Sequence, residues 1–169
     1  MLSHFVIEPI ESFYNDESDW MILQSFLSTN TSIDNFLRQE AYYKSIEFQG
    51  NTSLLLSPKK DLIGYFTLVD STIEFPDLVV PCIEVAKLAV QEDYQEQGIG
   101  TYLLEEIARV ARQTNHRYLT LDALFLHYMW YQKRGFFCLD PDEVDNHSDL
   151  IYMCHDLYDE DVVSHFLEE

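Results

Sequence analysis

Basic residues are scarce in this 169-residue sequence, where ten lysines and arginines stand against thirty aspartates and glutamates, for a formal net charge of −20. Such a surface repels nucleic acids and anionic membranes, because phosphate contacts need clustered lysine and arginine. We therefore expect no nucleic-acid partner, and attraction to cationic molecules. The alternative is that the acidic charge only keeps the protein soluble.

Long apolar runs and metal-binding spacings are also missing. No apolar stretch approaches the ~20 residues that cross a bilayer, and the N-terminus lacks the basic and apolar regions of a signal peptide. The three cysteines (Cys82, Cys138 and Cys154) have no C-x-x-C spacing, and the six histidines form no H-E-x-x-H motif. We expect a cytoplasmic protein in a reducing compartment, with no membrane association and no metal.

The length predicts one domain spanning residues 1–169, with room for one sizeable core. Periodicity and turn residues predict both strands and helices. Strands are expected at 5–7, 52–56, 62–69, 83–90, 118–122, 136–139 and 150–157. Helices are expected at 20–27, 33–41, 99–114 and 124–134, with a short helix in the acidic tail from Tyr158. Residues 71–81, bounded by Pro76 and Pro81, are expected to form a loop. This mixture predicts an α+β fold.

One stretch has a specific chemical use. The apolar segment 83–90 predicts a central strand, 91–97 a polar turn, and the apolar periodicity from Ile99 a helix. Gly98 and Gly100 lie at the start of that helix, where free backbone N–H groups and the helix dipole bind phosphate. Glycine lets a diphosphate approach the backbone closely. The alternative is a glycine-containing loop that only starts a helix, since the spacing matches neither G-x-G-x-x-G nor a P-loop.

The whole stretch resembles the acyl-CoA-binding signature of the GNAT superfamily of N-acyltransferases. The matching positions are Leu88-Ala89-Val90 and Gln95-Glu96-Gln97-Gly98-Ile99-Gly100. A second match, Trp130-Tyr131-Gln132-Lys133-Arg134-Gly135-Phe136, resembles the end of a helix in that family. The resemblance covers roughly residues 52–157. It implies a mixed, mostly antiparallel central sheet flanked by helices, with acetyl-CoA as cofactor.

The resemblance also implies roles for individual residues. Backbone groups of Leu88, Ala89 and Val90 would bind the pantetheine arm, with the Leu88 N–H directed at the thioester oxygen. The segment that would bind the diphosphate consists of Gln95, Glu96, Gln97, Gly98, Ile99, Gly100 and Thr101.

Tyr131 matches the family tyrosine that protonates the coenzyme A thiolate. Its alternative role is that of a core aromatic beside Trp130, and Tyr128 is the substitute candidate for the acid. The sequence departs from the family at Leu124, where many members have an asparagine, so one cofactor contact would be missing.

Glu84 is the candidate general base. It lies eleven residues before Gln95, a spacing at which some family members have a catalytic glutamate. Burial in a central strand would move the pKa of a glutamate toward neutral pH, where a base works best. Two interpretations stay open beside this one: Glu84 lies at the solvated start of the strand, or the base acts through water.

These residues predict an N-acetyltransferase that moves an acetyl group from acetyl-CoA to a primary amine of a small molecule or peptide. The N-terminal half would bind the acceptor. The segment Ile33-Asp34-x-Phe36-Leu37 also resembles a segment of GNAT toxins that acetylate aminoacyl-tRNA. Acetylation of aminoacyl-tRNA is therefore the alternative function. The net charge of −20 argues against this alternative. A non-catalytic acyl-CoA-binding regulator is a further alternative. A second copy of the chain stays open as a partner.

Overall fold

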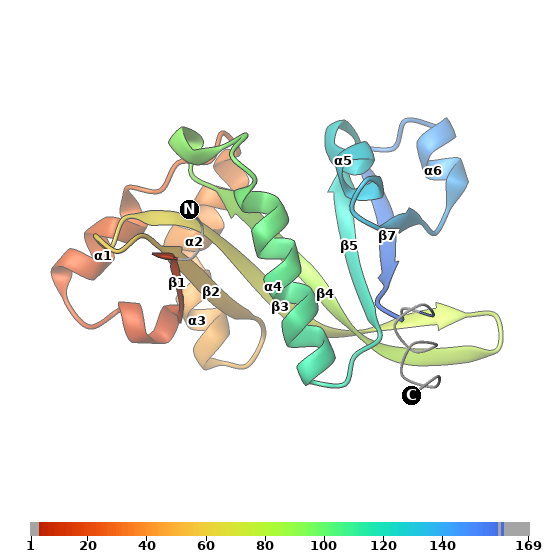
Figure 1. Ribbon diagram of the computed structural model, residues 1–169, viewed down its shortest axis with the longest axis horizontal. Coiled ribbons are helices and arrows are strands. Elements are labelled where there is room, and N and C mark those ends of the chain that lie inside the picture. The colour runs from red at the N-terminus through yellow and green to blue at the C-terminus, as the bar shows by residue number, and fades with distance from the viewer. Residues whose placement is uncertain (1–3, 159, 161–169) are drawn as a thin grey trace. The chain divides into compact units, whose positions relative to one another are not determined.

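The computed structural model describes residues 4–158 and 160. The strands are β1 (Val6–Pro9), β2 (Asn51–Leu56), β3 (Leu62–Phe75), β4 (Leu78–Val90), β5 (Tyr118–Leu124), β6 (Phe137–Cys138) and β7 (Leu150–Asp156). The α-helices are α1 (Glu17–Gln24), α2 (Thr31–Gln39), α3 (Ala41–Ile46), α4 (Ile99–Gln113), α5 (Tyr128–Gln132) and α6 (Pro141–Asp145). Short 3₁₀ turns are η2 (Ile10–Phe13), η3 (Glu92–Tyr94) and η4 (Phe125–His127). The strand order is β1-β2-β3-β4-β5-β7-β6 (Figure 1).

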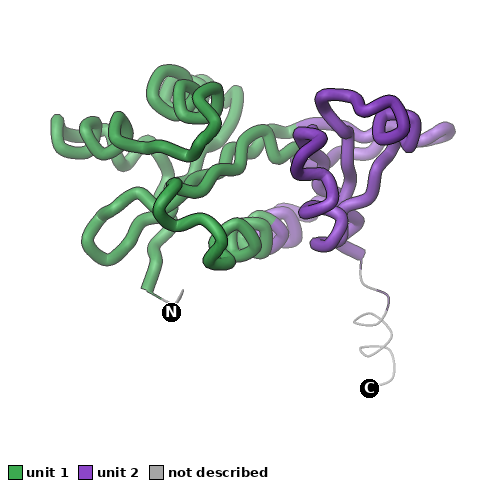
Figure 2. Tube along the Cα trace, turned by 90° about the horizontal axis from the view of Figure 1, so that it is seen from above, with its two compact units in different colours: residues 1–70, 84–107 green, residues 71–83, 108–169 purple. Residues whose placement is uncertain are grey.

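The chain divides into two compact units, coloured separately in Figure 2. Unit 1 comprises residues 1–70 and 84–107, and unit 2 comprises residues 71–83 and 108–169. Strands β3 and β4 and helix α4 each contribute residues to both units. The single domain predicted over residues 1–169 stays a prediction.

Unit 1 is a sheet with helices on both faces. Strands β1, β2 and β3 pair antiparallel, with Leu54 opposite Tyr65. Tyr65 packs in a core with apolar residues of α1, α2 and α3. A Cβ at the neighbouring Gly64 would lie 3.2 Å from Leu103 of α4. Because adjacent strand residues point to opposite faces, α1–α3 cover one face and α4 the other.

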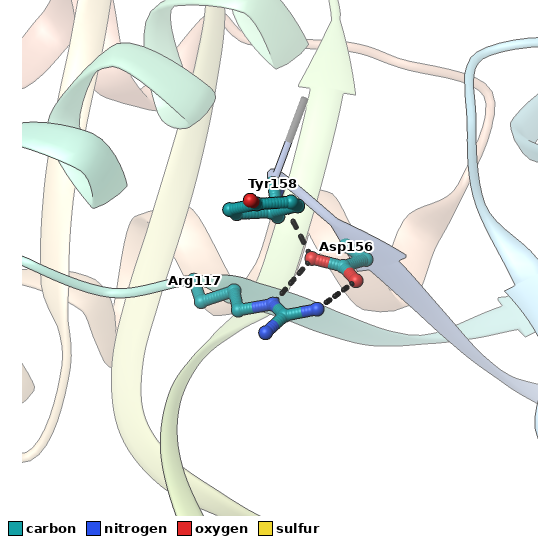
Figure 3. A network of polar contacts seen from close by, with 3 residues as sticks. All are labelled: Arg117, Asp156 and Tyr158. Carbon is teal, nitrogen blue, oxygen red and sulfur yellow. Dashed lines mark hydrogen bonds and ion pairs between the residues drawn. The ribbon is translucent and has the colours of Figure 1, made fainter. Parts of the chain in front are cut away.

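Unit 2 is built on β5 and β7, which pair antiparallel with Leu121 opposite Met153. The short β6 pairs with the other edge of β7. At the end of β7, Arg117 Nε and Nη2 donate to the two carboxylate oxygens of Asp156 at 2.8 and 2.7 Å, and the Tyr158 N–H donates to the same carboxylate at 3.0 Å (Figure 3). This bidentate pair joins the last residue of β7 to the residue just before β5.

The prediction of a loop at residues 71–81 was wrong. Strand β3 continues to Phe75 and β4 starts at Leu78, so that Pro76 and Asp77 make a tight turn. Alternating side chains hold this extension in place, with Ile73 buried and Thr72 and Glu74 exposed.

The helix expected at 124–134 is shorter. Leu124 is still part of β5, opposite Leu150 of β7, and the α-helix starts only at Tyr128. The expected strand at 136–139 is likewise reduced to the two residues of β6. The tail from Tyr158, expected to be helical, lies outside the described residues except for Tyr158 and Glu160.

Candidate active site

The predicted cofactor segment lies in unit 1 and runs from the end of β4 through the turn η3 to the first residues of α4. After Val90 the chain makes the 3₁₀ turn η3 and then two residues with positive φ, Glu96 at 62° and Gly98 at 82°. A side chain at Gly98 would meet no atom within 4 Å, so the space above this backbone is open. The positive φ favours glycine at position 98, since a residue with a Cβ is strained in that conformation.

The first turn of α4 has unpartnered donors. Among the described residues, no acceptor receives the backbone N–H of Gly98, Ile99 or Gly100. The first intrahelical bond is from the Tyr102 N–H to the Gly98 carbonyl at 3.1 Å. Three free N–H groups at the positive end of a 15-residue helix, next to open space, fit the phosphate groups of an acyl-CoA.

The other predicted cofactor residues differ in exposure. Leu88 and Val90 are half-buried in β4, whereas Ala89 is buried. Glu96 and Gln97 are exposed in the turn, and Thr101 is half-buried in α4.

The side-chain amide of Gln95 donates hydrogen bonds to two backbone carbonyls of the protein. Its Nε2 donates to the carbonyl of Val90 at 3.1 Å and to the carbonyl of Ser28 at 2.8 Å. The side-chain amide thus bridges the end of β4 and the loop between α1 and α2.

Glu84 lies near the middle of β4 and is half-buried. In the part of the chain that the structure describes, its carboxylate makes neither a hydrogen bond nor an ion pair. Its role as base stays a prediction.

Tyr131 is on α5 in unit 2, and its ring contacts two other aromatic rings. The ring centroids of Trp130 and Phe136 lie at 4.9 and 5.6 Å, both nearly perpendicular to it. Burial raises the pKa of Tyr131 to about 12. Its hydroxyl has no hydrogen-bond partner within residues 4–158 and 160.

The aromatic environment of Tyr131 continues into β7. His155 packs against Phe136 at 5.2 Å between ring centroids. A Cβ at Gly135, whose φ is 95°, would lie 2.7 Å from His155 Nε2. Gly135 therefore allows the chain to turn tightly after α5. The candidate substitute Tyr128 is half-buried and contacts Phe125 at 5.3 Å.

One polar cluster was not expected from the sequence. Asp34 of α2 is 4% exposed, and its carboxylate accepts from the N–H and the hydroxyl of Ser28. Tyr65, whose pKa is raised by burial and by the nearby Asp34, donates to the Ile33 carbonyl at 2.6 Å. An available signal was that Asp34 lies on the apolar side of its helix, three residues before the buried Leu37.

The geometry agrees with a comparison of the sequence with protein families. The family model described as the acetyltransferase (GNAT) domain matches residues 16–157. The chain belongs to the GNAT acetyltransferase family. It is therefore an acyl-CoA-dependent acetyltransferase, and its mixed, mostly antiparallel sheet flanked by helices is the fold that the sequence predicted.

Solved structures with this fold include bacterial toxins. A Tyr-to-Phe mutant of the toxin AtaT, bound to the C-terminus of the antitoxin AtaR and acetyl-CoA, has a TM-score of 0.74 and 18% identity over 92% of this chain and 94% of that chain. A Tyr-to-Phe mutant of KacT has a TM-score of 0.72 and 21% identity over 89% and 94%. AtaT complexed with acetyl-methionyl-tRNAfMet has a TM-score of 0.70 and 17% identity over 96% and 99%. At these identities the likeness is one of fold.

A search of curated proteins found no match. Within the described residues, no helix has the length and apolar character needed to cross a membrane.

Proposed function

We propose that the protein transfers an acetyl group from acetyl-CoA to a primary amine of a small molecule or a peptide. Acetyl-CoA is the cofactor and supplies the activated thioester. The observation that carries the proposal is the group of unpartnered N–H donors at Gly98, Ile99 and Gly100 beside open space. Three such donors at a helix start can bind an anion within a chain whose net charge is −20.

Tyr131 is the proposed general acid. Its raised pKa keeps the hydroxyl protonated at neutral pH, and no described group competes for that proton. A leaving thiolate can take the proton from it, although the thermodynamic drive is lower than for an unperturbed phenol. The Leu88 N–H is the proposed donor to the thioester oxygen.

Glu84 is the proposed base. It would take the proton that the attacking amine must lose, either directly or through a water molecule.

The acceptor is proposed to be an amine and not a nucleic acid, because few basic side chains are available. Six of the ten lysines and arginines are engaged with other groups. Arg38 donates to the Phe26 carbonyl and Arg109 to Gln113 Oε1, whereas Lys44 and Lys87 lie over the Phe36 ring. Arg117 pairs with Asp156, and Arg134 lies over the Trp130 ring. The other four are Lys59, Lys60, Arg112 and Lys133. Tracking a tRNA backbone requires a longer basic stripe.

Binding of acetyl-CoA tests the cofactor site. In Gly100→Trp a bulky side chain would lie beside the free N–H groups, and we expect affinity measured by calorimetry to fall by about tenfold or more, the loss of ~1.4 kcal/mol of binding free energy. Gln113→Trp, at the exposed far end of the same helix, is the matched control and should bind like the parent. Equal affinity in Gly100→Trp would remove the first turn of α4 from the cofactor site.

A second acceptor, aminoacyl-tRNA, is favoured by one observation. AtaT, which has this fold, is known as a complex with acetyl-methionyl-tRNAfMet. Acetylation of charged tRNA by the purified protein at physiological salt, without activity on any free amine, would establish this function in place of the first.

A further inference from the structure

The loop between α1 and α2, residues 26–30, is attached to the turn that follows β4. The Leu27 N–H donates to Gln91 Oε1 at 2.9 Å, and the Glu92 N–H donates to the Leu27 carbonyl at 2.7 Å. Gln95 adds the bond to the Ser28 carbonyl at 2.8 Å. Three hydrogen bonds thus connect two segments that are more than sixty residues apart in sequence.

Gln95 is the member of this set that also contacts the predicted cofactor strand. A side-chain amide has two N–H donors, and here the second donates to the carbonyl of Val90 at 3.1 Å. Val90 is the last residue of β4. One side chain therefore holds the loop 26–30, the end of β4 and the turn leading to Gly98 in a single arrangement.

The loop is held from its other side by the buried Asp34, whose carboxylate accepts from the Ser28 N–H and hydroxyl. Both anchors are on Ser28, and the next residue, Thr29, has φ 85°. A β-branched residue at positive φ is strained and keeps that conformation only where neighbouring contacts impose it. If the bonds to the turn were lost, relaxation of Thr29 would favour other loop conformations.

We propose that Gln95 is a positioning residue that couples cofactor binding at 88–101 to the order of the loop 26–30. The inference rests on the proposed function, in which the N-terminal half binds the acceptor. A bound diphosphate restrains the turn 91–98, and the hydrogen bonds extend that restraint to the loop. The coupling is reciprocal, so an ordered loop also favours cofactor binding.

Four variants distinguish the loss of the Gln95 hydrogen bonds from the effects of side-chain charge and size. Gln95→Met removes both donors without adding charge. Gln95→Glu also removes the donors and adds one negative charge, whereas Gln91→Glu adds the same charge to the same turn but keeps an oxygen that accepts from the Leu27 N–H. Gln95→Arg restores donors for the Ser28 and Val90 carbonyls.

Hydrogen exchange of the Leu27 and Ser28 amides is the measurement, made with and without acetyl-CoA at a concentration that calorimetry shows to saturate each variant. We expect acetyl-CoA to slow both amides about fivefold or more in the parent, in Gln91→Glu and in Gln95→Arg, the low end of typical coupling between sites. In Gln95→Met and Gln95→Glu the slowing should be lost at saturating acetyl-CoA, and the affinity for acetyl-CoA should be lower than in the parent, as reciprocal coupling requires.

Equal slowing in Gln95→Met and the parent would overturn the proposal, as would a parent that binds acetyl-CoA without any slowing at these amides. A parent that does not bind acetyl-CoA in the calorimeter would instead overturn the proposed function, and the coupling with it.

Discussion

The ring of Tyr131 packs against Trp130 and Phe136, and its hydroxyl has no hydrogen-bond partner among the described residues. If it protonates the leaving thiolate, Tyr131→Phe removes only the acid. We expect kcat to fall about a hundredfold or more, the low end of general acid catalysis, with acetyl-CoA affinity nearly unchanged. Tyr128→Phe is the matched control on the same helix, and steady-state kinetics of both variants make the comparison. Equal turnover in Tyr131→Phe and the parent would contradict the assignment.

The pH dependence of the reaction follows from the same residue. Because burial raises the pKa of Tyr131 to about 12, its acid form persists throughout neutral and mildly alkaline pH. We therefore expect no decrease in kcat from loss of this proton below about pH 10, the ordinary pKa of a tyrosine. A decrease centred below pH 9 in the parent and absent from Tyr131→Phe would contradict the raised pKa.

At the scale of elements, Gly64 sets the close approach of β3, β4 and α4 in unit 1. A Cβ there would lie 2.7 Å from the Ala89 carbonyl oxygen, which is backbone and cannot move aside alone. We expect Gly64→Ala to lower the free energy of unfolding by about 1–3 kcal/mol, as overpacking does, in urea denaturation. Gly50→Ala is the control, since its Cβ would meet side-chain methyl groups at 3.3 and 3.4 Å and a backbone oxygen only at 3.8 Å, an ordinary van der Waals distance. An equally small change in the free energy of unfolding in Gly64→Ala and Gly50→Ala would contradict this prediction.

Prediction from sequence succeeded where local signals agreed. The strand ending at Val90, the polar turn and the helix starting at Ile99 were all expected, because the apolar period changes at a glycine. It failed at the β3–β4 hairpin, where Pro76 and Pro81 suggested a loop although a strand continues on both sides. Here alternation of side chains and cross-strand pairing outweighed the prolines.

The attachment of Gln95 to Ser28 could not be predicted from the sequence, since hydrogen bonds between distant segments leave no periodic pattern. The role of Glu84 could not be predicted from the sequence either. Its spacing from Gln95 suggested a base, but no described side chain forms a hydrogen bond or an ion pair with its carboxylate.

At the scale of the whole molecule, the net charge of −20 should influence which acceptor is captured. A doubly charged diamine should have a kcat/KM that decreases as salt rises from low to high ionic strength, because salt screens the attraction. An amino alcohol of equal length, with one charge, should decrease less and is the matched control. The same salt dependence for both amines would show that the acidic surface does not steer the acceptor.

The transfer of labelled acetyl from acetyl-CoA, measured in parallel on a panel of primary amines and on charged tRNA, identifies the acceptor. We expect an acetylated amine and one released coenzyme A per acetyl group, with charged tRNA unmodified and Tyr131→Phe much slower. Binding of acetyl-CoA without transfer to any acceptor would contradict the proposed function and indicate a non-catalytic regulator, and transfer to charged tRNA alone would contradict the choice of acceptor.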